Sequence, residues 1–141
     1  MDLDTQRTGR TTTLRDARNR DFTFSYDGLG RLTSRVAPDG TSSWTWGSIA
    51  GNHEIGRLTS MTGPGYRENF TYDAVGRPAT RTIVTDTSYA YDYTYNALGL
   101  LDTLTYPAAG SIGRLKVGHQ YDAGRLTRLT YLDQTGVAVT A

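Results

Sequence analysis

The sequence predicts an all-β fold, an antiparallel meander of repeated hairpins. Two observations lead to this prediction: a short motif returns along the whole chain, and the stretches around it alternate apolar and polar residues. Turn-forming residues, mainly Gly, Asp, Asn and Pro, separate these stretches at regular intervals. We find no convincing helical period, and the polar segment 14–21 is the only ambiguous one.

The repeat unit is clearest in "TFSYDGLGRLTSRV" (23–36) and "NFTYDAVGRPATRT" (69–82). Related forms are "DYTYNALGLLDTLT" (92–105) and "GHQYDAGRLTRLT" (118–130). A marker glycine identifies about six copies, at Gly9, Gly30, Gly56, Gly76, Gly99 and Gly124, with gaps by subtraction of 21, 26, 20, 23 and 25 residues. We therefore predict a single repeat array over residues 1–141 that begins in mid-repeat, as a fragment of a longer array would.

Three kinds of residue accompany the marker glycine, and we interpret all of them as structural. The arginine after it is Arg10, Arg31, Arg57, Arg77 or Arg125, with Leu100 in the fifth copy. The aromatic residue before the turn is Tyr26, Trp46, Tyr72, Tyr95 or Tyr121. The acid or amide after the aromatic is Asp27, Asp73, Asn96 or Asp122. Each has a role in a turn or a strand, and repeats reuse identical residues for stacking whatever the protein binds.

Each copy is predicted to form a strand, a tight turn and a second strand. In "YAYDYTY" (Tyr89–Tyr95) tyrosine occupies every second position, which places all four rings on one face of a strand. "FTFSY" (Phe22–Tyr26) follows the same scheme. Thr, Val, Tyr and Phe dominate these runs, and such residues fit a pleated surface.

The motif residues explain the turn. The Asp27 side chain can accept a backbone N–H two residues on, in an Asx-type turn, and Asn96 preserves that acceptor. Gly30 is free to adopt the left-handed conformation that closes a short loop. Arg31 then re-enters the next strand near Asp27, where a charge pair can form.

A second set of turns returns the chain between copies. "PDG" (38–40) is the strongest of these signals, and "GPG" (63–65) and "TDTS" (85–88) are weaker ones. Together the two sets of turns predict roughly ten to twelve short antiparallel strands.

Composition limits the functional classes. With 141 residues the chain is large enough for one ordinary domain with a real core. A formal net charge of +1 argues against a nucleic-acid or membrane-surface protein. Fourteen of the fifteen basic residues are Arg, which suits stacked and bidentate contacts better than Lys. The chain has no Cys, shows no signal peptide in its polar first twenty residues, and has no apolar stretch long enough to span a membrane.

The motif resembles that of the YD-repeat or RHS-repeat family. "FSYDGLGRLTSRV" and "FTYDAVGRPATRT" match its Y-D-x-x-G-R-L-T signature, and "WTWGSIAGNHEIGRLTSMT" is similar to a variant with Trp for Tyr and an insertion before Gly-Arg-Leu. The resemblance covers essentially the whole chain. Family members include bacterial polymorphic toxins, insecticidal toxin-complex components, wall-associated proteins and teneurins, whose repeats build a β-sheet that spirals into a hollow shell.

The resemblance implies that the chain forms part of a curled sheet or shell, without catalysis. Its partners would be the remaining repeats of the parent shell and an enclosed C-terminal toxin or effector polypeptide. The parent would be a larger bacterial protein, secreted or on the cell surface. Six copies are too few to close a shell, and the chain has neither the Asp-Pro dipeptide typical of the family's self-cleavage site nor a following toxin domain.

The alternative function is a carbohydrate- or cell-surface-binding module. Trp44 and Trp46 are two residues apart, hence on one face, and are candidate ligand-stacking residues. Packing of both rings against a neighbouring strand is the more ordinary interpretation, and we favour it.

No catalytic, cofactor or metal site is predicted. His53 and His119 are the only general-base candidates near neutral pH, and neither has a partner at a catalytic spacing. An enzyme such as a glycosidase would require turnover that Glu54→Gln or Glu68→Gln removes, and nothing in the sequence indicates a pair of carboxylates at the separation that a glycosidase needs.

The expected sheet is open. It would expose hydrogen-bonding edges at Thr11–Leu14 and Thr127–Tyr131, so we predict that the chain, expressed alone, is marginally folded or self-associates. Leu126 and Leu129 fall out of phase with the alternation, which a β-bulge would explain.

Overall fold

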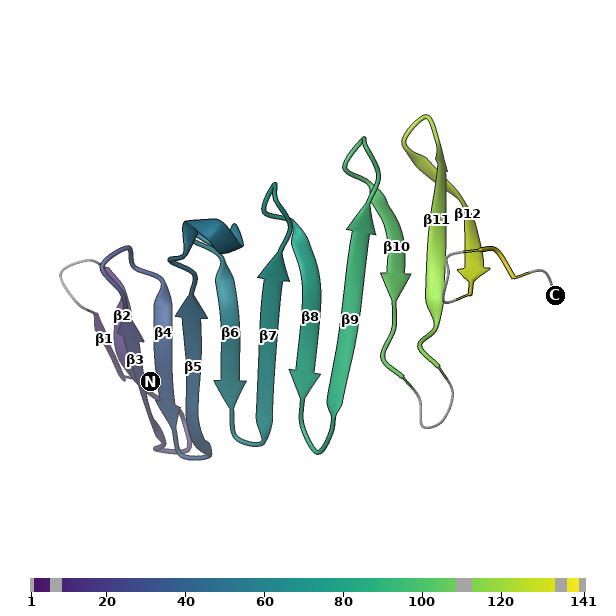
Figure 1. Ribbon diagram of the computed structural model, residues 1–141. Helices are drawn as coiled ribbons and strands as arrows, with labels where there is room; N and C mark the ends of the chain where they lie inside the picture. Colours follow the sequence, from purple (N-terminus) through teal and green to yellow (C-terminus); the bar gives the residue numbers. More distant parts are fainter. Residues whose placement is uncertain (1, 6–8, 109–112, 134–136, 140–141) are drawn as a thin grey trace.

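The computed structural model describes residues 2–5, 9–108, 113–133 and 137–139. Over these residues the chain forms one twelve-stranded antiparallel sheet whose strands follow in chain order (Figure 1). The strands are β1 (Asp2–Thr5), β2 (Thr11–Arg15), β3 (Asp21–Tyr26), β4 (Leu32–Ala37), β5 (Gly40–Trp46), β6 (Leu58–Gly63), β7 (Tyr66–Tyr72), β8 (Pro78–Val84), β9 (Ser88–Tyr95), β10 (Leu101–Thr105), β11 (Lys116–Asp122) and β12 (Arg125–Leu132). A single 3₁₀ turn, η1 (Ala50–Asn52), is the helical part of the described chain, and it is too short to span a membrane. The predicted all-β meander is confirmed.

Two rows of turns connect the strands. The turns with the marker glycines lie along one side of the sheet, at the top in Figure 1, and join β1–β2, β3–β4, β5–β6, β7–β8, β9–β10 and β11–β12. The return turns lie along the opposite side, and three of them fall at residues 38–39, 64–65 and 85–87, as the "PDG", "GPG" and "TDTS" signals predict. The ambiguous segment 14–21 forms the end of β2, a turn and the start of β3.

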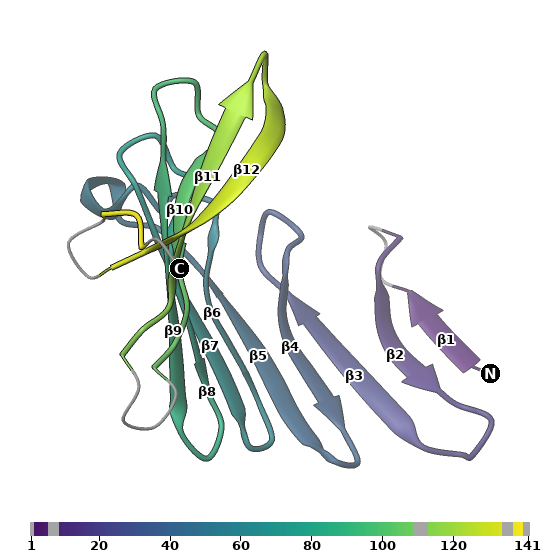
Figure 2. The ribbon, with the colours of Figure 1, turned by 90° about the vertical axis from the view of Figure 1, so that its right-hand side faces the viewer.

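A β-bulge recurs in every hairpin at one motif position. In the second hairpin Ser25 pairs with Ser34 and Tyr26 with Leu32, so Thr33 is the extra residue on β4. The equivalent residues are Thr12, Thr59, Ala79, Asp102 and Thr127, each two after the motif Arg or Leu. The predicted bulge is therefore present at Thr127. Leu126 pairs with Tyr121 and Leu129 with His119, two residues apart on β11, so the bulge brings both leucines onto one face although they are three positions apart. Bulges of this kind increase the local right-handed twist, which is visible in Figure 2.

The threonine of the motif has a role at this bulge. The Thr59 hydroxyl donates to the Thr45 carbonyl at 3.1 Å, and the Thr127 hydroxyl donates to the Gln120 carbonyl at the same distance. In both cases the acceptor carbonyl lies beside the position where the bulge interrupts the strand pairing, so the Thr side chain stabilises the bulge.

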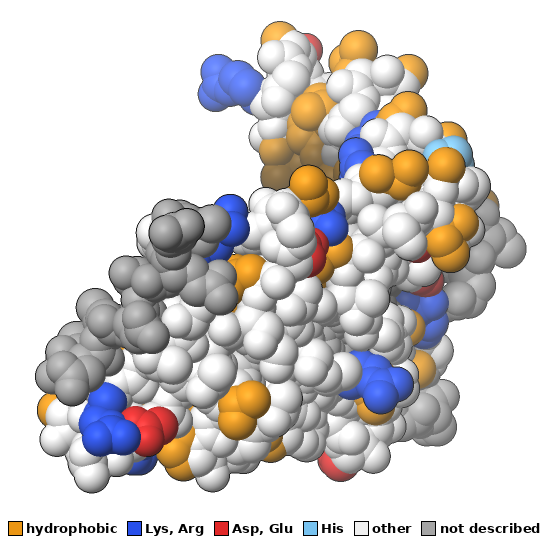
Figure 3. Space-filling model, turned by 90° about the vertical axis from the view of Figure 1, so that its left-hand side faces the viewer, with side chains coloured by type: hydrophobic (Ala, Val, Ile, Leu, Met, Phe, Trp, Pro, Cys, Tyr) orange, Lys and Arg blue, Asp and Glu red, His pale blue; other side chains and the backbone are white. Residues whose placement is uncertain are grey.

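The two faces of the sheet have different chemistry. One is rich in hydroxyl groups, as in the cross-strand row Thr45–Ser60–Asn69–Thr82–Ala90. The other, the aromatic face, carries the row Trp44–Met61–Glu68–Ile83–Tyr89 and hence all four tyrosines of β9. Figure 3 views the molecule from the left-hand side of Figure 1. Much of the lower surface in this view is white, the colour of the backbone and of side chains that are neither charged nor hydrophobic.

Among the described residues the sheet has almost no buried core. Ala37, 7% exposed, and Val117, 9% exposed, are the buried apolar residues of the described chain. The physical reason is that the sheet is a single layer, and within the described residues no second sheet or helix packs on either face (Figure 2). Each strand contacts its sheet neighbours, so stability depends on interactions between adjacent hairpins, as in other repeat proteins.

The expected edge at Thr11–Leu14 is wrong. β1 pairs with β2 along this segment, so β1 is the first edge among the described residues. The strand β1 has the sequence Asp-Leu-Asp-Thr, with a single apolar residue, so the alternation of apolar and polar residues did not identify it. β12 is the last strand, as expected, but Ala138 forms a bridge with Leu132 and the Val139 N–H donates to the Tyr131 carbonyl at 2.9 Å.

Candidate functional site: the joint between repeats

The motif acid organises each turn through both backbone and side chain. The Asp27 N–H donates to the Arg31 carbonyl at 3.0 Å, and the Gly30 N–H donates to the Asp27 carbonyl at 2.9 Å. Asp27 Oδ1 accepts the N–H groups of Leu29 and Arg31, both at 2.9 Å, while Oδ2 accepts Arg31 Nε at 2.7 Å. Gly30 has φ +80°, the left-handed region that favours glycine. One carboxylate therefore holds the whole loop, including the arginine that leaves it.

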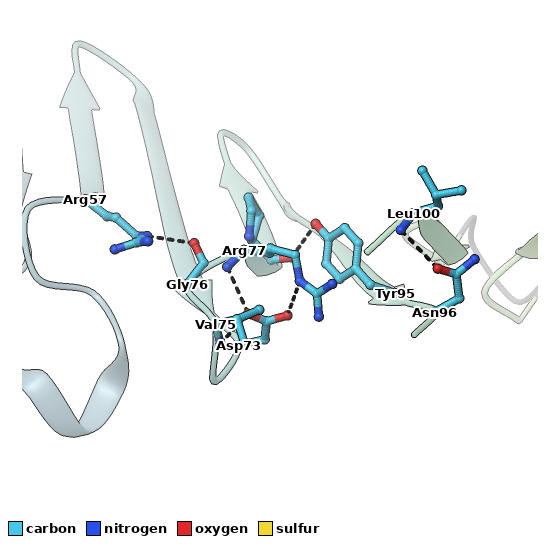
Figure 4. A network of polar contacts seen from close by, with 9 residues as sticks. Arg57, Asp73, Val75, Gly76, Arg77, Tyr95, Asn96 and Leu100 are labelled. Carbon is cyan, nitrogen blue, oxygen red and sulfur yellow. Dashed lines mark hydrogen bonds and ion pairs between the residues drawn. The ribbon is translucent and has the colours of Figure 1, made fainter. Parts of the chain in front are cut away.

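The fourth and fifth copies use the same geometry. Asp73 Oδ1 accepts from Val75 and Arg77 at 3.0 and 2.9 Å, and Oδ2 accepts Arg77 Nε at 2.7 Å. Asn96 Oδ1 accepts from Leu98 and Leu100, both at 3.0 Å; Figure 4 shows the bond from Leu100. The amide thus keeps the turn, and no arginine is present for it to bind.

The arginine contacts lower the pKa of the two motif carboxyls. For Asp27 the backbone N–H of Arg31 is the main cause. For Asp73 desolvation raises the pKa, but the hydrogen bonds from the backbone and side chain of Arg77 outweigh it and the net direction is downward. Both groups therefore favour the ionised form that the arginine needs.

The third copy keeps the turn without an acid. The Gly47 N–H donates to the Arg57 carbonyl at 2.7 Å and the Gly56 N–H donates to the Gly47 carbonyl at 3.0 Å, which reproduces the backbone bonds of Asp27. The insertion from Ser48 to Ile55 therefore projects from an otherwise ordinary turn. A Cβ on Gly47 would overlap Glu54, so this close approach requires glycine in place of the acid.

The arginine of each hairpin lies over the aromatic ring of the next hairpin. This contact occurs at four successive places, with the guanidinium Cζ 5.9, 5.0, 5.6 and 4.2 Å from the ring centroid, for Arg10–Tyr26, Arg31–Trp46, Arg57–Tyr72 and Arg77–Tyr95. Cation–π contacts of this kind contribute roughly 0.5–1 kcal/mol at exposed sites.

The polar atom of the same ring bonds back to the preceding hairpin. Its acceptor is always the carbonyl of the residue after the arginine. The pairs are Tyr26 with Thr11 at 2.8 Å, Trp46 with Leu32 at 2.8 Å, Tyr72 with Leu58 at 2.5 Å and Tyr95 with Pro78 at 2.9 Å. Burial raises the pKa of Tyr72 and of Tyr95, which keeps both hydroxyls protonated as donors. We call the stacked arginine together with this ring hydrogen bond the joint.

The marker glycine of the next turn provides space for the arginine. A Cβ on Gly30 or Gly76 would overlap the guanidinium of Arg10 or Arg57, and Arg57 Nε also donates to the Gly76 carbonyl at 2.6 Å (Figure 4). Neither arginine has a motif acid in its own turn. Arg77, which Asp73 holds, would lie 3.5 Å from a Cβ on Gly99. The acid therefore controls how far the arginine extends over the next turn.

The last hairpin departs from this pattern. Its loop is one residue shorter, Asp122 pairs with Arg125, and both Ala123 and Gly124 have positive φ, +47° and +79°, as in a type I′ turn. In the part of the chain that the structure describes, neither an Asx-type bond at Asp122 nor a ring contact at Tyr121 occurs.

Two further turns of the same type were missed in the sequence. Asp16 Oδ1 accepts from Arg18 and Arg20 at 2.9 and 3.0 Å, and Oδ2 accepts Arg20 Nε at 2.8 Å, with Asn19 at φ +60° in the place of glycine. Asp133 Oδ1 accepts the Val137 N–H at 2.9 Å. Both lie on the side of the return turns. A search for D-x-x-[GN] instead of the marker glycine alone would have found them.

A second polar network lies on the aromatic face. Glu68, 3% exposed, accepts the Tyr66 hydroxyl at 2.5 Å and forms an ion pair with Arg81. Desolvation raises the pKa of Glu68, but the hydrogen bonds from Arg81 and Tyr66 outweigh it and lower the pKa overall. The carboxylate is therefore enclosed by its own partners.

The remaining sequence candidates are scattered over the sheet. His53 is the residue that ends η1, His119 lies in β11, and Glu54 lies in the insertion. Among the described residues no group of three or more His, Asp or Glu could hold a metal ion. Trp44 is half-buried in β5, and the Trp46 ring is covered by Arg31.

Comparison with known proteins agrees with this geometry. No curated protein matches the chain. Residues 7–42 match the RHS Repeat family, a segment that includes the first joint, the complete second turn and the strands β2, β3 and β4. The matched turn is built like those of the other copies, which supports an RHS/YD-repeat protein.

Proposed function

We propose that this chain is a non-catalytic wall segment of an RHS-type β-shell that encloses a toxin or another polypeptide cargo. RHS repeats are a structural repeat family, found in secreted and cell-surface proteins. The observation that carries the proposal is a single-layer sheet with two chemically different faces and, over the residues that the structure describes, almost no core of its own. Such a sheet separates two spaces and extends by adding hairpins at its edges.

The joints support a role as a wall. They fix each hairpin to the next by the same two contacts, so the spacing and twist repeat along the sheet. The aromatic face suits a polypeptide cargo, because tyrosine presents ring area and a hydroxyl group together. The remaining repeats of a parent protein and the cargo are the proposed partners, in a secreted or surface-exposed bacterial protein.

A photo-cross-linking experiment tests the contact with cargo. A photoreactive phenylalanine replaces Tyr93 on the aromatic face or Thr82 on the hydroxyl face, and a carboxymethylated, permanently unfolded polypeptide is added. We expect cross-links from position 93 and few from position 82. The proposal would be overturned if an added folded protein were labelled as strongly as the unfolded polypeptide, or if neither position gave cross-links.

The alternative is a carbohydrate- or cell-surface-binding module. Trp44 is the residue that would act in it, since Arg31 covers the Trp46 ring and its indole N–H donates to the Leu32 carbonyl. A glycan-array signal that Trp44→Ala abolishes and Trp46→Tyr retains would favour this function over the wall.

A further inference from the structure

The chain passes from one repeat hairpin to the next at five places within the described residues, and four of them carry the joint. At β2–β3, β4–β5, β6–β7 and β8–β9 an arginine stacks on the next ring and that ring bonds back to the preceding hairpin. The fifth place, β10–β11, combines Leu100 with Tyr121.

Both contacts of the joint are missing at this fifth place. Leu100 carries no charge for the ring, and Asn96 holds only the backbone of its turn. In the described chain the Tyr121 hydroxyl does not donate to the Leu101 carbonyl, which is the acceptor that the pattern assigns to it. A Cβ on Gly124 would have no atom within 4 Å, so no side chain lies over this turn as one does over Gly30 and Gly76.

The strand pairing at this place is also short. Thr103–Thr105 pair with Lys116–Gly118. The β2–β3 pairing is equally short, over Thr13–Arg15 with Asp21–Thr23, but it has the Arg10–Tyr26 contact and a two-bond ion pair between Arg15 and Asp21, at 2.5 and 2.7 Å. β10–β11 therefore combines a short ladder with a missing joint.

A different contact connects the same hairpins at the opposite end of the strands. Arg114, just before β11, donates to Asp92 Oδ2 at 2.5 Å and to the Ala90 carbonyl at 2.7 Å, both on β9. It also donates to the Tyr106 carbonyl at 2.9 Å, and the Tyr106 ring meets Tyr91 edge-on at 6.0 Å. The two hairpins are thus held at their return-turn end and free of a joint at their motif-turn end.

We propose that the sheet contains a hinge between β10 and β11, placed there by Leu100. The hairpin β11–β12 separates from β10 at the motif-turn end, while Arg114 keeps it attached at the other end. This device does not depend on the cargo or on the wall function, because it follows from the contacts of this chain alone.

Hydrogen exchange of the backbone amides tests the hinge in the unmodified chain. The amides that bond between β10 and β11 should exchange at least tenfold faster than those between β8 and β9, since the latter are held by the Arg77–Tyr95 joint. Equal exchange at the two places would overturn the proposal.

Two reciprocal variants assign the hinge to Leu100. Leu100→Arg should slow exchange at β10–β11, because Arg57 shows that an arginine without a motif acid still stacks on the next ring. Arg77→Leu should transfer the fast exchange to β8–β9. Exchange at β4–β5 is the internal control and should stay unchanged in both. If Leu100→Arg leaves β10–β11 as fast as before, the proposal is wrong, whether or not Arg77→Leu folds.

Discussion

The middle of the sheet, β3 to β9, and the C-terminal hairpin β11–β12 are made from the same repeat but are held differently. In the middle, each arginine is bound in or near its own turn and stacks on the next ring. At the C-terminal hairpin a leucine replaces the arginine, the loop is shorter and β12 is exposed along Arg125–Leu129. Because the described part of the sheet has almost no core to compensate, a single replacement changes how firmly a whole hairpin is attached.

The largest expected effect is a comparison of two marker glycines. Gly76 and Gly124 have nearly the same φ, +80° and +79°, but Arg57 lies over Gly76 and nothing lies over Gly124. Gly124→Ala should cost about 1 kcal/mol of unfolding free energy for the left-handed conformation. Gly76→Ala should cost about 2–3 kcal/mol, because it also displaces the arginine from its joint. Urea unfolding followed by circular dichroism measures both, and equal losses would contradict a role for the joint.

A buried polar group in each region gives the next comparison. Glu68 is fully bonded, whereas His119 Nδ1 and Thr130 Oγ1, both in the C-terminal hairpin, are buried without a hydrogen-bond partner. Glu68→Gln should cost about 2 kcal/mol, which is below the roughly 3–5 kcal/mol for breaking a fully buried ion pair because Arg81 is 41% exposed. Thr130→Val should be neutral or stabilising, since it removes an unsatisfied hydroxyl. A stability loss in Thr130→Val would show that this hydroxyl is bonded after all.

The Glu68 network also predicts a pH dependence. The pKa of Glu68 is lowered in the folded state, so its contribution is complete above the ordinary value of 4.5. It is lost as the pH falls from that value through the folded pKa, since the unfolded state then takes up a proton first. Unfolding midpoints measured from pH 6 downward should therefore fall more steeply for the natural chain than for Glu68→Gln. Parallel curves would contradict this sign.

Much of the fold could be predicted from the sequence because turns and strand faces are local properties. The Asp27 turn, the left-handed Gly30 and the one-sided tyrosines of β9 each follow from a few neighbouring residues. The missed turn at Asp16 follows from equally local rules, but Asn19 replaces the glycine that served as the marker.

The joint could not be predicted in the same way. Arg31 and Trp46 lie on different hairpins, and their contact depends on the twist and on the recurring bulge between them. Sequence reasoning assigned Arg31 to Asp27, which is correct but describes half of its contacts. The near absence of a core among the described residues could not be predicted either, because a composition that can fill a core does not reveal whether a second layer exists to enclose it.

The motif acid gives a smaller effect. Asp73 holds the backbone of its turn and the side chain of Arg77, while Asp122 has no Asx-type bond among the described residues. Asp73→Ala should lower the thermal midpoint, Asp73→Asn should lower it less because Asn96 shows that an amide keeps the turn, and Asp122→Ala should leave it unchanged. The pKa of Asp73 is lowered in the folded state, so its stabilising contribution is complete at pH values above the ordinary pKa of an aspartate. The effect of the Asp73 substitutions should therefore weaken as the pH falls below that value. An equal effect of Asp122→Ala would remove this difference between the regions.

The smallest expected effect isolates the ring hydrogen bond of the joint. Tyr95→Phe removes the bond to the Pro78 carbonyl and leaves the ring under Arg77, so it should cost about 1 kcal/mol. Tyr121→Phe removes a hydroxyl that has no partner within the described chain, and should cost close to nothing. Because the two substitutions delete the same atom from the same residue type, the difference between their unfolding free energies measures the bond itself. A loss in Tyr121→Phe as large as in Tyr95→Phe would mean that the last hairpin is joined like the others, and the contrast between the two regions would then rest on the arginine alone.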